Sequence, residues 1–344
     1  MTTIENIRAC VNLQVPDQLP VFANSQEFDA RYNGLTYSEY IRDAETVVRS
    51  QLNVIDRFGW DWSWLHLDDT LEFEPLGVGV AAGENVVPAT ANYLPFDKKT
   101  LASLKVPDPR TAARMPLLLD AIAGLREARG DATCITGRVA APFSAVTLIF
   151  GMQESFYTLV DNPKLFKDAL KFAEEQATAW GLAQIEAGAH AIWYGDCNAS
   201  SHLISPGQFE TWALEPCKRV CETFKEAGAF VFLHNSEEKL EALRLQALTE
   251  PSGLSSGPGI DREVVAREFA GQICTIGNVD PIVLLQLGSA SQVAAETDRQ
   301  VRLMAAGGMI LNSGECIPRE AKAPNLHTMA DTARKVWNLL QHHQ

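Results

Sequence analysis

The stretch HAIWYGDCNASSHLISPGQFETWALEPCKRVCETFKEAGAFVFLH, residues 190–234, decides the fold of this chain. It begins with an apolar run at 190–196 and ends with another at 229–234, and both runs are typical of buried strands. Between them, Ser205 is a suitable helix N-cap and Gly228 is a suitable left-handed residue at the helix end. A strand, a helix and a second strand in this order predict parallel strands joined by a crossover helix.

The same alternation recurs along the whole chain. The remaining strand-like runs bring the total to eight and lie at 19–24, 60–67, 132–139, 252–257, 272–278 and 307–314. Eight strands that alternate with helices predict a single α/β domain over residues 1–344, a closed (β/α)8 TIM barrel. The long gap at 68–131 is interpreted as an insertion between strands 2 and 3. An open doubly wound sheet is the alternative, although no glycine-rich nucleotide motif follows the first strand.

The overall composition excludes several classes of function. The chain has 344 residues and a formal net charge of -14, which argues against binding to the phosphates of nucleic acids. It has no signal-like start and no apolar run long enough to span a bilayer, so neither secretion nor a membrane location is expected. Seven irregularly spaced cysteines suit a reducing compartment, and we expect a cytoplasmic protein. The sequence leaves open whether the protein forms a homo-oligomer.

Polar side chains stand at the ends of most of the predicted strands. The C-terminal ends of barrel strands meet at one mouth, where the active sites of such barrels lie. The polar residues expected at this mouth include Asn24, His66, Arg138, Asp196, His234, Asn278, Glu315 and Cys316. Asp196 directly follows an apolar strand, where a carboxylate must be paired, solvated or functional, so we expect it to act as an acid–base group or a ligand.

Aromatic residues near the same strand ends are candidates for a flat apolar pocket. Trp62, Trp64 and Trp193 would line this pocket for an aromatic ring, with His66 and Asn278 as further substrate contacts. Packing in the core is the structural alternative for the tryptophans, and a hydrogen bond to a loop is the alternative for His66.

His234 is the strongest candidate for a metal ligand. Zinc is bound by imidazole, thiolate and carboxylate groups, and a catalytic zinc keeps one position open. Glu315 and Cys316 are adjacent in the chain and compete for a second position on the same ion. About 80 positions separate them from His234, so only the fold brings these residues together.

Several segments together resemble one protein family. The segments 190–220, 276–293 and 307–336, with the shorter matches YIRDAETVVRSQL and KVPDPRTAARMP, resemble the uroporphyrinogen decarboxylase-like superfamily. Its members are single (β/α)8 barrels. True uroporphyrinogen decarboxylases carry an arginine-rich RQAGR segment near the N-terminus, where this chain has only Arg31. A substrate with many carboxylates needs several cationic partners, so this chain is poorly equipped for it.

Within this superfamily the chain resembles the corrinoid-dependent methyltransferases. Thiol-using members bind zinc through an HxC motif that ends the fifth strand and a GC motif that ends the eighth. Here His234 matches the histidine, whereas Ser236 replaces the first cysteine. Glu315 stands at the position of the second cysteine, and Cys316 follows one residue later.

The resemblance implies a zinc enzyme that works with a corrinoid (cobalamin) carried by a partner corrinoid-binding protein. A carboxylate ligand in place of a thiolate would make the zinc a stronger Lewis acid, which suits cleavage of a methyl ether. We therefore expect the methyltransferase component of an O-demethylase, which passes a methyl group from a methoxylated aromatic to cob(I)alamin. The alternatives are a methylcobamide:thiol methyltransferase, a uroporphyrinogen-type or other small-acid decarboxylase, and a metal-free binding homologue.

Overall fold

A sheet of parallel strands forms the centre of the computed structural model, which describes residues 1–342. Its strands follow each other in chain order, and every neighbouring pair is parallel. They are β3 (Thr136–Ala140), β4 (Ala191–Gly195), β5 (Phe230–His234), β6 (Gly253–Ser255), β7 (Cys274–Ile276) and β8 (Met309–Ile310). The unit predicted at 190–234 is present as β4, a helical segment and β5, with Gly195 and His234 paired at the strand ends.

Two further parallel segments close this sheet into a barrel. Val21 pairs with Leu311 beside β8, and Trp62 pairs with Cys134 just before β3. The backbone N–H of Asp61 donates to the carbonyl oxygen of Val21 at 2.9 Å, which joins the two segments to each other. The predicted (β/α)8 barrel is therefore confirmed.

The first two predicted strands occupy their places in the barrel but do not form regular ladders. Side chains accept the hydrogen bonds that a neighbouring strand would otherwise accept. Asp61 Oδ2 lies 2.8 Å from the backbone nitrogen of Val21, and Gln51 Oε1 lies 2.8 Å from that of Trp64. The prediction of continuous strands at 19–24 and 60–67 was wrong in this respect.

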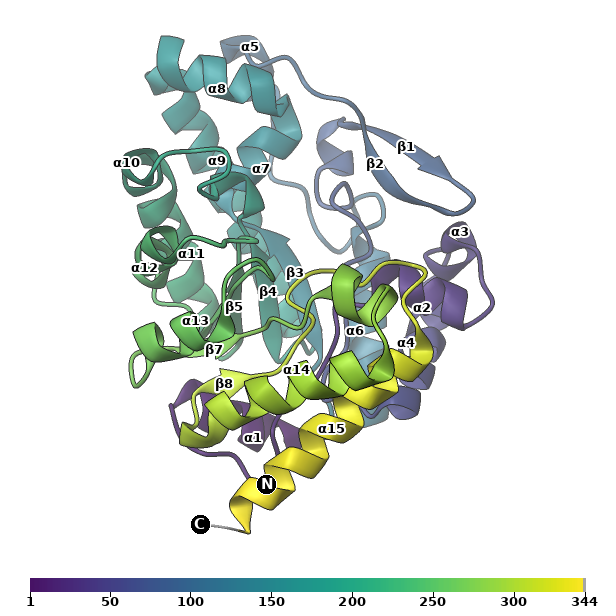
Figure 1. The fold of residues 1–344 in the computed structure, drawn as a ribbon. Helices are drawn as coiled ribbons and strands as arrows, with labels where there is room; N and C mark the ends of the chain where they lie inside the picture. Colours follow the sequence, from purple (N-terminus) through teal and green to yellow (C-terminus); the bar gives the residue numbers. More distant parts are fainter. Residues whose placement is uncertain (343–344) are drawn as a thin grey trace.

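Helices surround the barrel (Figure 1). They are α1 (Thr3–Val11), α2 (Gln26–Tyr32), α3 (Tyr37–Tyr40), α4 (Ala44–Phe58), α5 (Lys98–Ser103), α6 (Met115–Arg129), α7 (Pro142–Phe150), α8 (Met152–Asp161), α9 (Pro163–Glu186), α10 (Pro206–Gln208), α11 (Leu214–Glu226), α12 (Leu240–Ala247), α13 (Arg262–Phe269), α14 (Ala290–Leu303) and α15 (Ala323–Gln341). Of these, α3 lies beside a hairpin at residues 79–92, and α5 and α8 lie farther from the sheet (Figure 1). Shorter 3₁₀ or π turns are η1 (Glu74–Leu76), η2 (Cys197–Ala199), η3 (Phe209–Ala213), η4 (Pro281–Gln286) and η5 (Met304–Ala306). Within residues 1–342, no helix is both long enough and apolar enough to cross a bilayer.

The predicted insertion between the second and third barrel strands contains an antiparallel hairpin. Its strands are β1 (Gly79–Gly83) and β2 (Val86–Asn92), and they form a separate sheet away from the barrel (Figure 1). The backbone N–H of Ser38 donates to the carbonyl of Glu84 at the hairpin turn. The hairpin has no clear signal in the sequence because its strands are exposed or half-buried except at Pro88, are rich in glycine and alanine, and have no apolar face.

Aromatic side chains fill the barrel interior. The ring centroids of Trp62 and Phe232 are 5.0 Å apart, and those of Trp64 and Trp193 are 5.2 Å apart in an edge-to-face arrangement. Strand side chains alternate between the interior and the helical layer. On β4, Trp193 faces the interior, whereas Tyr194 packs against Phe224 of α11. Both faces of the strands are buried, which explains their continuous apolar runs.

The outer layer generates a test of the fold at Gly181, where α9 crosses α11. A Cβ atom at this position would lie 2.1 Å from the ring of Phe224. We expect Gly181→Ala to lower the free energy of unfolding by about 1–3 kcal/mol because the overpacked helices must separate. The midpoint of denaturant unfolding measures this loss. In Gly207→Ala, the new Cβ has no neighbour within 4 Å among the described residues, and this control should leave the midpoint nearly unchanged. Equal effects of the two variants would contradict the packing.

Candidate active site at the mouth of the barrel

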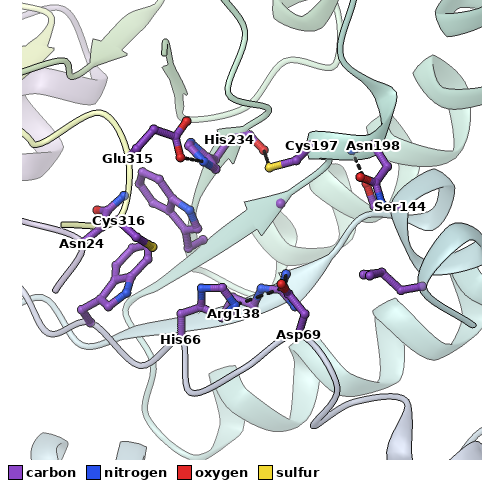
Figure 2. A pocket seen from close by; sticks show the side chains of 14 residues that line it. Asn24, His66, Asp69, Arg138, Ser144, Cys197, Asn198, His234, Glu315 and Cys316 are labelled. Carbon is purple, nitrogen blue, oxygen red and sulfur yellow. Dashed lines mark hydrogen bonds and ion pairs between the residues drawn. The ribbon is translucent and has the colours of Figure 1, made fainter. Parts of the chain in front are cut away.

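A cavity of about 180 Å³ lies among the C-terminal ends of the barrel strands. It takes side chains from both the sheet and the loops that follow it (Figure 2). The lining residues are Asn24, Trp64, His66, Asp69, Arg138, Ser144, Leu148, Trp193, Gly195, Cys197, Asn198, His234, Glu315 and Cys316. Several of the residues predicted from the strand ends are therefore brought together: Trp64, His66, Trp193, His234, Glu315 and Cys316.

His234 is the last residue of β5 and is 7% exposed. It points inward because Phe230 and Phe232, at alternate positions before it, also face the barrel interior. Its Nδ1 lies 3.0 Å from Ser255 Oγ, and its ring lies 5.1 Å from that of Trp193. The histidine is therefore held by a hydroxyl on one side and an aromatic ring on the other.

The other ring nitrogen of His234 forms an ion pair with Glu315. His234 Nε2 and Glu315 Oε2 are 3.3 Å apart, and Figure 2 shows the two side chains facing each other across the site. Burial alone would lower the pKa of His234, but the negative charge of Glu315, with a smaller contribution from the neighbouring Cys197, outweighs it and raises the pKa to about 10. Burial opposes ionisation of Glu315, yet the charge of His234 holds the pKa of this carboxyl below its usual range. The pair is therefore an imidazolium and a carboxylate at neutral pH.

Ser236 completes this side of the site. Its Oγ lies 3.4 Å from His234 Nε2 and 3.5 Å from Cys197 Sγ. The backbone of Ser236 has a φ of 52°, in the left-handed region that residues other than glycine rarely adopt. This unfavourable conformation brings the hydroxyl to the edge of the His234 imidazole.

The opposite wall of the cavity carries a second group of charges. Arg138 on β3 donates to Glu72 at 2.7 Å and pairs with Asp69, which lies 3.1 Å from His66 Nε2. Burial raises the pKa of Glu72 to about 7, although the charge of Arg138 opposes this rise. Figure 2 shows His66, Arg138 and Asp69 across the cavity from the His234–Glu315 pair. Because carboxylates already surround Arg138, this wall offers no free cation comparable to an arginine-rich substrate clamp.

Trp62 and Asn278, two predicted substrate contacts, do not line the cavity. Trp62 is 1% exposed and packs in the barrel core, which is the structural alternative stated from the sequence. Asn278 follows β7, but its Nδ2 donates to the carbonyl oxygens of Gly257 and Ile260 at 2.6 and 2.9 Å. Its side chain thus fixes the loop after β6, and a direct substrate contact is not supported.

Asp196, the predicted acid–base residue, also lies outside the cavity lining. Asp196 lies two residues after Tyr194, so the two side chains point to the same face of the sheet. Tyr194 faces outward, and the Asp196 carboxyl therefore lies between the sheet and the helices. Asp196 Oδ1 accepts hydrogen bonds from the backbone N–H and the hydroxyl of Ser144, at 3.1 and 2.8 Å. Ser144 in turn accepts from the backbone N–H of Asn198 at 3.1 Å, and both residues line the cavity. Asp196 therefore positions two site residues that sequence analysis missed.

The predicted zinc ligands are only partly assembled. His234 and Glu315 face each other and Cys316 lines the same cavity, but no three His, Cys, Asp or Glu side chains within residues 1–342 converge as a metal site. A catalytic zinc takes three protein ligands. His234 and Glu315 form an ion pair, and the described side chains do not form a complete zinc site.

The fold and the cavity together define a (β/α)8 barrel protein with its site at the C-terminal strand ends. The family model described as uroporphyrinogen decarboxylase (URO-D) matches residues 2–336, and the chain belongs to this family. A protein of Methanosarcina acetivorans, named methylcobamide:CoM methyltransferase MtbA, is 26% identical over 97% of this chain and 98% of its own length. The protein of the same name from Methanosarcina mazei is 24% identical over 97% and 98%.

A solved structure shares the whole fold. It is described as a methyltransferase from Methanosarcina mazei and superposes with a TM-score of 0.89 at 22% identity, covering 97% of this chain and 99% of its own. The resemblance to the methyltransferase branch of the superfamily, stated from the sequence, is confirmed by these relatives.

The buried carboxyl of Asp196 should make the stability of the fold depend on pH. Burial raises its pKa to about 7, and only the hydrogen bonds from Ser144 oppose the rise. The folded state therefore keeps a proton that the unfolded chain releases near pH 4, so this contribution to stability is lost as pH rises through about 7. We expect Asp196→Asn to gain stability relative to the wild type between pH 5 and pH 8, measured by denaturant unfolding. Asp120→Asn, an exposed change on α6, is the control. A difference that does not change with pH would contradict this assignment.

Proposed function

We propose that this protein is a corrinoid-linked methyltransferase that cleaves a methyl ether, with methoxylated aromatics as the donor class. The ion pair between His234 Nε2 and Glu315 Oε2, at 3.3 Å, carries this proposal. By the resemblance stated from the sequence, Glu315 takes the position of the second cysteine, so a carboxylate stands in place of a thiolate. A buried imidazolium is an acid, and cleavage of an ether requires a proton for the leaving oxygen. The membership of the URO-D family and the MtbA relatives support the general class of methyl transfer.

The size and walls of the cavity support a small aromatic donor. A cavity of about 150 Å³ suffices for benzene, and this one measures about 180 Å³. Trp64 and Trp193 form an aromatic corner on its wall. A corrin macrocycle is far larger than this space, which is consistent with a corrinoid that stays on a partner protein and meets the donor at the mouth.

In the proposed step, a methyl group leaves oxygen and a proton arrives there. The partner's reduced corrinoid supplies the electron pair that takes the methyl group. The C–O bond breaks, its electron pair remains on oxygen, and His234 donates a proton to give the free phenol. The Glu315 carboxylate raises the pKa of His234, so the imidazole carries the proton that a general acid donates to the leaving oxygen. Glu315 stabilises the imidazolium before transfer.

Transfer of a methyl group to a thiol is the second candidate, since the two MtbA relatives are named for such an activity. A thiol must lose its proton before it attacks a methyl group, and relatives of the thiol-using kind achieve this with zinc. A protonated His234 is a poor base for this purpose. One observation favours the thiol candidate. Glu315 Oε1 is buried and has no hydrogen-bond partner within the described residues, and a zinc ion on His234 and Glu315 would use this oxygen.

The first test of the function is demethylation with and without His234. The purified protein, reduced cobalamin and anisole or another methoxylated aromatic should form methylcobalamin and the phenol. We expect His234→Gln to lower the rate about 10²- to 10⁴-fold because the leaving oxygen loses its proton donor. Absorbance of methylcobalamin and chromatography of the phenol measure the reaction. His202→Gln, an exposed change in the loop after β4, should retain the rate. Methylation of a thiol from methylcobalamin, without ether cleavage, would favour the second candidate.

A second test asks whether a zinc site is complete. Ser236 Oγ lies 3.4 Å from His234 Nε2, so Ser236→Cys would place a thiolate at this position. Together with His234 and Glu315, the thiolate would supply three ligands. We expect zinc content, measured by elemental analysis after dialysis, to rise from well below one to about one per chain. The wild type and Ser236→Ala are compared in parallel. A wild type that already holds one zinc per chain and loses it in His234→Gln would establish the metal and overturn the proton-donor role.

A further inference from the structure

The wall of the cavity opposite His234 carries an accessible carboxylate. Asp69 lines the cavity and its side chain is 52% exposed, whereas the neighbouring side chains of Arg138 and Glu72 are 12% and 4% exposed. Arg138 and His66 both contact Asp69 through the same oxygen, Oδ1. Asp69 Oδ2 accepts no hydrogen bond from the described residues, so this oxygen is left for a ligand.

The carboxylate of Asp69 is charged and held in place. Burial opposes its ionisation, but the positive charges of Arg138 and His66 outweigh this effect and hold the pKa of Asp69 below its usual range. Arg138 is fixed in turn by Glu72, whose Oε1 lies 2.7 Å from Arg138 Nη1. An ionised carboxylate accepts hydrogen bonds and donates none. The group that Asp69 binds must therefore be a hydrogen-bond donor, and an anion is repelled.

Aromatic and aliphatic side chains line the same cavity. Trp64 and Trp193 stand edge to face with their ring centroids 5.2 Å apart, and Leu148 of α7 is a further lining residue. Figure 2 shows Asp69 across the cavity from His234. An aromatic ring in this space therefore presents its opposite ends to two different polar groups.

We propose that Asp69 Oδ2 binds a ring hydroxyl of the methyl donor, at the end of the ring opposite the methoxy group. This inference rests on the proposed function and narrows its donor class to methoxyphenols in which the two oxygens lie across the ring. When the methoxy oxygen of 4-methoxyphenol faces His234, its hydroxyl points towards Asp69 and donates to it. In 2-methoxyphenol the two oxygens are adjacent, so they reach only one of the two polar walls.

The same arrangement excludes donors that carry a ring carboxylate. A carboxylate in place of the hydroxyl would meet the negative charge of Asp69. Arg138, the cation on this wall, is already paired with Asp69 and Glu72. The carboxylate would thus lose its hydration without gaining a free cationic partner, which disfavours its binding.

Ligand-observed NMR titration tests this subsite by binding alone, with 4-methoxyphenol, 2-methoxyphenol, anisole and 4-methoxybenzoate as probes. We expect the wild type to bind 4-methoxyphenol about tenfold more tightly than 2-methoxyphenol or anisole, because it gains a hydrogen bond to a charged group. 4-Methoxybenzoate should bind most weakly of the four. Equal affinities for 4-methoxyphenol and 2-methoxyphenol would overturn the proposal.

Two variants separate the hydrogen bond from the charge. Asp69→Asn keeps an oxygen for Arg138 and replaces the other by an NH2 group, so 4-methoxyphenol should lose its tenfold advantage over anisole. Binding of 4-methoxybenzoate should rise about tenfold in this variant, because the negative charge is gone and Arg138 has lost one carboxylate partner. Asp69→Glu keeps the charge but displaces the oxygen, so it should lose the advantage of 4-methoxyphenol and still exclude 4-methoxybenzoate.

Asp161→Asn, an exposed change at the end of α8, is the control for the loss of one negative charge. It should bind all four probes like the wild type. A gain of 4-methoxybenzoate binding in Asp69→Asn cannot arise from misfolding, and thermal unfolding checks that both Asp69 variants are folded. Wild-type affinities for every probe in both variants would overturn the subsite.

The binding test and the demethylation test fail separately. A protein that binds the probes in the expected order but does not cleave anisole would retain the subsite and reject the proposed reaction. Cleavage of anisole by a protein that binds 4-methoxyphenol no more tightly than anisole would retain the reaction and reject the subsite.

Discussion

The hydrogen bonds between the first barrel segment and the chain after β8 are the constraint on which both the fold and the site depend. Phe22 donates to the carbonyl of Leu311, and the backbone N–H of Ile317 donates to that of Asn24 at 2.8 Å. These bonds close the sheet into a barrel and, at the same time, bring Glu315 across the mouth to His234. Arg31, the only arginine of residues 21–34, supports them through its Nη2, which donates to the carbonyl of Ala321 at 2.7 Å. Its role here is to hold the chain that bears the carboxylate.

The electrostatics of the cavity follow from the ion pair between His234 and Glu315. A histidine beside two thiolates and a metal is neutral, whereas a buried histidine beside one carboxylate keeps its proton. The pKa of His234 and that of Glu315 move in opposite directions, as expected for a pair in which each charge stabilises the other. The ion pair therefore favours the protonated form of His234, which makes this side of the cavity acidic in character.

Much of the fold and part of the site could be predicted from the sequence. Buried parallel strands appear as apolar runs, and this gave the barrel and placed His234 at a strand end. Strand alternation alone would also have turned Asp196 outward, since it shares the parity of Tyr194 and not that of Trp193. Strand alternation does not show, however, how close to the mouth of the barrel a side chain lies. Trp62 and Trp64 face the same side, yet only Trp64 reaches the cavity. Ser144 was missed because it enters the site from α7, which no strand pattern locates.

Ser236 shows how strongly the site constrains the backbone that carries it. A left-handed conformation at a serine is less favourable than at a glycine by an amount on the order of 1 kcal/mol. Glycine would relieve this cost, but it would remove the hydroxyl between Cys197 and His234 Nε2. The buried carboxylate of Glu237 holds the adjoining loops in place through the backbone N–H and hydroxyl of Ser201, at 2.8 and 2.7 Å. The strain is thus maintained by contacts outside the cavity, as expected when a side chain is kept for its function and not for the stability of the fold.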